Sequence, residues 1–207
     1  MVNKTRKREE MLEGEMEYGF SLIEMMTSIV VMSVFFLISV TAIGKIKDKS
    51  YSESIVTTVQ AISNECRSVA ISQGVDCGIV FKEENDEVLV RIYKDGDYDG
   101  INSDDIKTKK DTPLTDWEKL TKEDARIAIP EGATKDPSNK QFESKDPIKF
   151  GRGDILTFSP KATATPGTLY IADGYEESGF AIRVVGIDGR IKIYRFRGGA
   201  WSEIARW

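Results

Sequence analysis

Histidine is absent from this chain of 207 residues, and cysteine occurs only twice. Without histidine, the chain cannot form Ser-His-Asp or Cys-His nucleophilic sites, imidazole-held zinc or haem, or the usual general base near neutral pH. Two cysteines are too few for an all-cysteine zinc site or a disulfide framework. We therefore predict that the protein is not an enzyme and that it requires no cofactor.

An excess of basic charge is also lacking. The chain carries 34 acidic residues against 29 lysines and arginines, which gives a formal net charge of −5. A general electrostatic affinity for nucleic acid or anionic lipid is therefore not expected, and such a contact would need a local patch. With 40% hydrophobic and 30% charged residues, the composition is that of an ordinary globular protein of one domain or slightly more.

One segment departs from this average. Residues 25–44 carry no charge, and about 20 such residues form a helix long enough to cross a hydrocarbon core of about 30 Å. We predict a single-pass protein of the bacterial inner membrane. The basic residues before this segment keep the N-terminus cytoplasmic by the positive-inside rule, so the bulk is periplasmic; they are Lys4, Arg6, Lys7 and Arg8.

Glu24 is an ionisable residue near the start of this apolar run, which opens at Phe20. A carboxylate there is costly, so it either serves a function or reaches out to the lipid headgroups. Gly19 stands directly before Phe20, and the sequence FSLIE then leads into the run. This pattern resembles the processing site of type IV prepilins and pseudopilins.

The resemblance implies that a prepilin peptidase cuts after Gly19 and that Phe20 becomes the N-methylated N-terminus of the mature protein. It also implies that Glu24 acts in filament assembly. Cleavage leaves a positive α-amine on an apolar helix, and a carboxylate one turn along offers that amine a partner.

The helix is expected to continue beyond the apolar run, to about Gln73. Apolar residues recur at steps of three and four, as on one face of an α-helix, and polar residues such as Ser52 and Ser63 fill the other faces. Gly74 is the expected stop. The apolar positions are Ile55, Val56, Val59, Ile62, Cys66, Val69 and Ala70.

Strands are expected in the rest of the chain. Residues 77–81 and 87–93 flank a polar turn and predict a hairpin, and four further strands are expected at residues 155–158, 168–171, 180–185 and 190–196. Residues 107–150 predict a long excursion with one short strand at 126–129. The expected fold class is α+β: a long N-terminal helix, half transmembrane, packed on an antiparallel β-sheet. Its parts are a leader (1–19), the transmembrane half of the helix (20–44) and an extracytoplasmic globular domain (45–207).

The C-terminal half carries a second resemblance. The segments FSP at 158–160, GTLYI at 167–171 and GRIK at 189–192 are similar to the GspH/FimT group of minor pseudopilins. This implies a type IV pilin-like fold and a structural role beside other pilins. The expected function is that of a minor subunit of a type II secretion pseudopilus or type IV pilus, in its initiation or tip complex.

The alternative function is DNA binding during natural transformation, which some FimT-like members perform through a G-R-x-R segment. Lys192 takes the place of the second arginine here and loses its planar fork. Aromatic residues lie between the basic ones, which would suit phosphate contacts with base stacking. The alternative explanation of the pattern is an exposed strand face or a contact with a neighbouring pilin. The candidates are Arg190, Lys192, Arg195 and Arg197.

A loop beginning at Asp95 offers a candidate calcium site. Carboxylates at loop positions 1, 3 and 5 followed by glycine open an EF-hand-like loop, but position 12 is Ile106 instead of an acid. A solvated turn shaped by Asp and Gly is the alternative. The candidate residues are Asp95, Asp97, Asp99, Ile101, Asp104 and Asp105.

The two cysteines form the last candidate site. Cys66 lies near the end of the expected helix and Cys77 opens the first expected strand. Outside the cytoplasm a disulfide between them would persist. Cys66 also lies on the apolar helix face, so a buried free thiol is the alternative.

Overall fold

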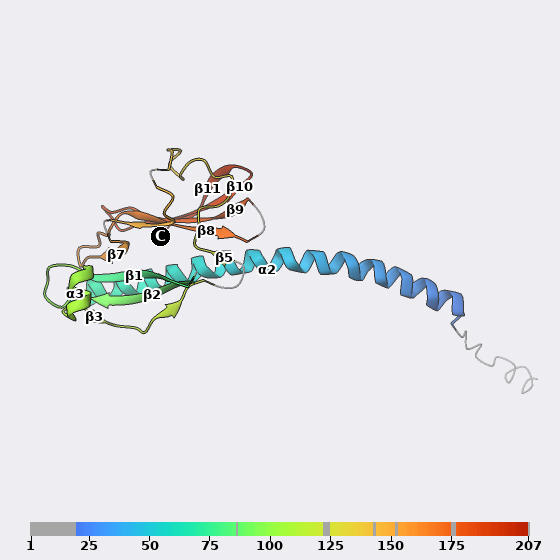
Figure 1. Cartoon of the computed structure of the whole chain (residues 1–207), viewed down its shortest axis with the longest axis horizontal. Helices are drawn as coiled ribbons and strands as arrows, with labels where there is room; N and C mark the ends of the chain where they lie inside the picture. Colours follow the sequence, from blue (N-terminus) through green and yellow to red (C-terminus); the bar gives the residue numbers. More distant parts are fainter. Residues whose placement is uncertain are drawn as a thin grey trace, which may run out of the picture. The chain divides into compact units, whose positions relative to one another are not determined.

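The computed structural model describes residues 20–85, 87–121, 125–142, 144–151, 153–174 and 177–206, without the side chains of residues 39–50. The expected leader, including Gly19, lies outside the described residues. The chain divides into two compact units, Met1–Ile43 and Gly44–Trp207. Helix α2 (Leu22–Gln73) contributes to both units (Figure 1).

In the first unit, the described part of α2 is apolar apart from Glu24 and a few hydroxyl side chains. Every large apolar side chain from residue 20 to residue 38 is at least 52% exposed. The hydroxyls of Thr27, Ser28 and Ser33 donate to backbone carbonyls three or four residues earlier. Because these polar groups bond within the helix, they do not form a polar stripe along it.

No helix in the described part of the chain is both long enough and apolar enough to cross a membrane. The structure therefore does not support the predicted half-transmembrane helix or the predicted single-pass inner-membrane location.

In the second unit, α2 buries the predicted apolar stripe. Ile55, Val56, Val59, Cys66 and Ala70 are buried in the core, and Ile62 and Val69 pack against it. The expectation that the serines face away is wrong, because Ser52 and Ser63 are also buried. Both continue the three- and four-residue steps of the stripe.

Sheet A holds the predicted hairpin, whose strands are antiparallel. Glu84 pairs with Glu87, so the turn contains only Asn85 and residue 86. Asn85 has a φ of 53°, a conformation that Asn tolerates in tight hairpin turns. The strand order is β3-β2-β1-β7, with β4 also paired to β2. These strands are β1 (Cys77–Glu84), β2 (Glu87–Lys94), β3 (Thr112–Pro113), β4 (Glu118–Lys119) and β7 (Ile155–Phe158).

Sheet B is formed by the C-terminal strands together with two short strands from the long excursion. Its order is β11-β10-β9-β8-β5, with β6 also paired to β8, and all pairs are antiparallel. The short strand expected at 126–129 overlaps β5 only at Arg126, because β5 covers Ala125–Arg126. The strands are β5 (Ala125–Arg126), β6 (Ile148–Phe150), β8 (Gly167–Asp173), β9 (Ser178–Val184), β10 (Ile191–Arg197) and β11 (Ala200–Arg206).

The expected fold class is therefore wrong. The described chain is mostly antiparallel β-structure in two sheets, with a short second helix α3 (Ser103–Thr108), and it lacks the half-transmembrane helix packed on one sheet. Hydrophobic alternation shows which face of a strand is buried, but it does not show which strands pair. Here β7 pairs with β1 in sheet A, whereas β8, the next strand in the sequence, lies in sheet B.

One core cluster joins α2 to both sheets, and the rings of Phe81 and Phe150 stack across it with centroids 5.6 Å apart.

Candidate metal centre

Three of the predicted calcium ligands converge in the loop after β2. Asp95, Asp97 and Asp99 each offer a carboxylate oxygen, and these oxygens all lie within 4.8 Å of one another. Asp95 is buried, whereas Asp97 and Asp99 are exposed. A hard cation such as calcium prefers this set of oxygen ligands.

The Asp95 carboxylate also shapes the loop backbone. Its Oδ1 accepts the N–H groups of Asp97 (3.0 Å) and Tyr98 (2.8 Å), and its Oδ2 accepts the N–H of Gly100 (3.0 Å). Gly100 has a φ of 96°, which a residue without a side chain adopts readily. Oδ1 therefore uses both of its lone pairs on the turn, whereas Oδ2 accepts one N–H and keeps a second lone pair for a cation.

Lys110 enters the same cluster. Its Nζ lies 2.9 Å from Asp97 Oδ2 and 3.0 Å from Asp105 Oδ1. The hydrogen bond from Lys110 is the largest effect that lowers the pKa of Asp105. Loss of hydration, followed by the charges of Asp105 and Asp97, raises the pKa of Asp99. The cluster thus contains more carboxylates than this one ammonium group neutralises.

Asp111 belongs to the cluster but was not predicted. It is only 1% exposed; its Oδ2 accepts the Asn102 N–H at 3.3 Å, and its Oδ1 is buried without a hydrogen-bond partner. Burial is the main cause that raises the pKa of Asp111; backbone hydrogen bonds from Asn102 and Gly96 oppose it, and the charges of Asp95 and Asp105 raise it further. Lys94 of β2 pairs with Thr112 of β3, so the next residues along, Asp95 and Asp111, lie opposite each other.

Helix α3 separates the other predicted ligands. Its N-cap, Asn102, accepts the N–H groups of both Asp104 and Asp105, and the helical turn then directs their side chains differently. Asp105 is buried beside Lys110, whereas exposed Asp104 forms an ion pair with Lys107 at 3.4 Å. The structure therefore brings Asp105 into the cluster and leaves Asp104 outside. The side chain of Ile101 is apolar and packs against Gly78 of β1.

The two cysteines meet in the core. Their sulfur atoms are 2.6 Å apart, and both residues are fully buried free cysteines. Burial is the main cause that raises the pKa of the Cys66 thiol, and the neighbouring Cys77 raises it further. A raised pKa suppresses the reactive thiolate in the folded chain. The predicted disulfide stays a prediction, and these features favour its formation before the core closes.

The described residues of the predicted processing site lie at the start of α2. Phe20 and Ser21 precede the helix, and the Ser21 carbonyl accepts the N–H of Met25 at 3.1 Å. Glu24 lies in the first turn, where the partial positive charge of a helix N-terminus favours a carboxylate.

Most of the predicted DNA-contact residues have acidic neighbours. Arg190 pairs with Asp188 at 3.1 Å, and Lys192 lies 3.4 Å from Glu203. Arg195 of β10 pairs with Glu53 of α2 at 2.8 Å, while Arg197 is exposed. DNA binding stays a prediction, and these ion pairs reduce the positive potential available to phosphates.

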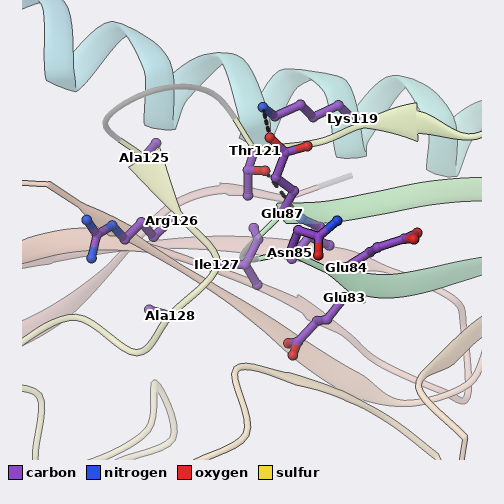
Figure 2. Close-up of a pocket in the computed structure, with 11 residues that line it drawn as sticks. Glu83, Glu84, Asn85, Glu87, Lys119, Thr121, Ala125, Arg126, Ile127 and Ala128 are labelled. Atoms are coloured by element: carbon purple, nitrogen blue, oxygen red, sulfur yellow. Dashed lines mark hydrogen bonds and ion pairs between the residues drawn. The ribbon is translucent and has the colours of Figure 1, made fainter.

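A cleft of about 730 Å³ lies between the β1–β2 hairpin and the segment around β5 (Figure 2). Lys119 and Glu87 form an ion pair in it, and the N–H of Val88 donates to the Thr121 hydroxyl at 3.2 Å. The described lining residues contain no cysteine or serine that could act as a nucleophile. The lining residues are Glu83, Glu84, Asn85, Glu87, Val88, Lys119, Thr121, Ala125, Arg126, Ile127 and Ala128.

Comparison with known proteins gives no relatives for this chain. No protein-family model matches it, and no curated protein or solved structure shows significant similarity to it. The functional argument therefore rests on the residues and their geometry.

The sulfur–sulfur contact predicts a disulfide in protein isolated from an oxidising compartment. Unreduced protein should be two hydrogen atoms lighter than reduced protein by intact mass. Reduction should lower its stability by about 2–3 kcal/mol, because the bond closes a short loop in the unfolded chain. Cys66→Ala serves as the control that shows no mass difference. Two thiols that react in the unreduced, unfolded chain would contradict the prediction.

The raised pKa of Asp111 predicts a pH-dependent effect of Asp111→Asn. At neutral pH the ionised carboxylate opposes folding, and this penalty is lost as the pH falls through the raised pKa. The variant should therefore melt higher than the parent in chelator at neutral pH, by about 3 °C for roughly 1 kcal/mol. The difference should shrink as the solution is acidified. Asp104→Asn, in which an exposed carboxylate changes, should melt like the parent.

Proposed function

We propose that the chain is a non-catalytic structural subunit, a minor pilin or pseudopilin. It assembles with other pilins into a type II secretion pseudopilus or type IV pilus, as part of its initiation or tip complex outside the cytoplasm. The observation that carries this proposal is the apolar surface of α2 over residues 20–38, where every large apolar side chain is at least half exposed.

This surface needs a partner. Soluble proteins rarely expose contiguous apolar patches of this extent, and such patches mark interaction sites. A surface helix of a globular domain presents one apolar stripe and a polar opposite face. Residues 20–38 lack such a polar face, so packing among the helices of several subunits accounts for them better than packing on one sheet.

The start of α2 supports processing at the predicted position. Phe20 and Ser21 are outside the helix, which begins at Leu22. A peptidase acts on an accessible, non-helical bond, and cleavage after Gly19 would place the new amine directly before the first helical turn. Glu24 lies in that turn, within reach of an amine on its own or a neighbouring helix.

The acidic cluster supports a second role for the chain as a calcium-binding protein. Buried Asp111 Oδ1 has no hydrogen-bond partner, and an unpaired buried carboxylate oxygen is costly unless a cation satisfies it. Position 12 of the EF-hand-like loop is Ile106 and has no carboxylate. In the fold, Asp105 and Asp111 lie close enough to the loop to take the place of that missing acid. Bound calcium would stabilise the fold without taking part in catalysis. The five proposed ligands are Asp95, Asp97, Asp99, Asp105 and Asp111.

Met32→Arg tests the assembly role. A guanidinium placed among packed apolar helices costs about 3 kcal/mol or more, which is a loss of roughly a hundredfold in assembly affinity. Filament fractions from the native host, quantified by mass spectrometry, should contain little of this variant, whereas the parent should be present and begin at Phe20.

Thr57→Arg, on an exposed position of the second half of α2, is the matched control and should assemble normally. Both variants should keep the urea unfolding transition of the parent, because neither position is buried. Normal assembly of Met32→Arg would contradict the proposal.

Calcium binding predicts a thermal shift. A ligand that binds only the folded state at a hundredfold excess over its Kd adds about 2.7 kcal/mol, or roughly 5–10 °C in a domain of this size. The chain should therefore melt higher in millimolar calcium than in chelator. The double variant Asp97→Asn, Asp99→Asn should lose this shift, and Asp104→Asn should retain it. Equal melting of the parent in both buffers would show the loop to be a turn without metal.

A further inference from the structure

We propose that Lys110 is a built-in competitor for the metal: its ammonium group holds the acidic cluster together without calcium and leaves when the ion binds. This inference rests on the proposed calcium site. It assigns to Lys110 a role in setting the affinity of that site, which the loop sequence by itself does not indicate.

The geometry places the ammonium group among the proposed ligands. Lys110 Nζ contacts Asp97 at 2.9 Å and Asp105 at 3.0 Å, and Asp97 is one of the three residues whose oxygens converge. Calcium requires six to eight oxygens at about 2.3–2.6 Å. The ion and the ammonium group are both cations that need the same carboxylate oxygens, so they compete for them.

The backbone of Lys110 is fixed, but its side chain is free to leave. The N–H of Lys110 donates to the Asp105 carbonyl at 3.0 Å, and the next residue, Asp111, is buried. The side chain of Lys110 is 52% exposed, and its four-carbon stem is flexible. Exchange of the ammonium group for calcium therefore needs only side-chain rotation towards water.

Two opposite consequences follow from this exchange. Without metal, Lys110 reduces the repulsion among the carboxylates and stabilises the loop. With metal, its removal from Asp97 and Asp105 subtracts from the binding free energy and weakens calcium affinity. A residue with a purely structural role would stabilise both forms and would not oppose binding.

Calorimetric titration of the full chain with calcium chloride tests the inference, after chelator has been removed. For Lys110→Gln we expect a Kd about fivefold lower than that of the parent, the order expected when partly exposed ion pairs no longer have to be broken. The same variant should melt lower than the parent in chelator. Lys107→Gln is the matched control, because Lys107 pairs with Asp104 outside the cluster, and it should change neither value.

Lys110→Arg keeps the positive charge and should bind calcium no more tightly than the parent, which tests the inference even if the glutamine variant does not fold. A parent-like or weaker affinity of folded Lys110→Gln, or tighter binding by Lys110→Arg, would overturn the competitor role while leaving the calcium site intact. Absence of calcium binding in both the parent and Lys110→Gln would overturn the site itself.

Discussion

The second half of helix α2 provides the contact on which both sheets depend. Its buried stripe, which includes Ile55, Val59 and Cys66, lies in the one core cluster shared by strands of sheet A and sheet B. Polar contacts extend this connection, because Arg67 lies over the Phe158 ring of β7 and donates to the Gly189 carbonyl before β10. An antiparallel sheet buries one face and leaves the other to solvent, and here one helix and one core serve the buried faces of two sheets.

The sequence predicts where the helix and strands of this domain lie better than it predicts which strands pair with one another. The helix and six strands follow from local periodicity, which depends only on neighbouring residues. Strand β11 was missed because most of its side chains are exposed, so it has no apolar alternation. The division into two sheets depends on the pairing of β1 with β7, residues that are far apart in sequence. The burial of Ser63 was also missed. Its polarity favours an exposed face, but its position on the helix places it in the buried stripe.

The acidic cluster could be predicted only in part for a related reason. The spacing of Asp95, Asp97 and Asp99 predicts that their side chains meet in one loop, which the structure shows. Asp111 joins them through the pairing of β2 with β3, and Lys110 joins them because α3 turns the chain back towards the loop. Contacts that depend on a short helix and a two-residue strand leave little signal in the sequence, although they determine the charge balance of the site.

The two halves of α2 differ in the number of neighbours they require. From residue 52 to residue 70, one stripe of the helix is buried and the opposite side is polar. The strands of the globular domain cover this one stripe, so this half needs no further apolar partner. From residue 20 to residue 38, the apolar side chains point in all directions around the helix and are exposed. A single partner can cover only one side of a helix about 10 Å across. The proposed packing among helices of successive subunits would supply apolar neighbours on several sides at once, which a one-to-one complex would not.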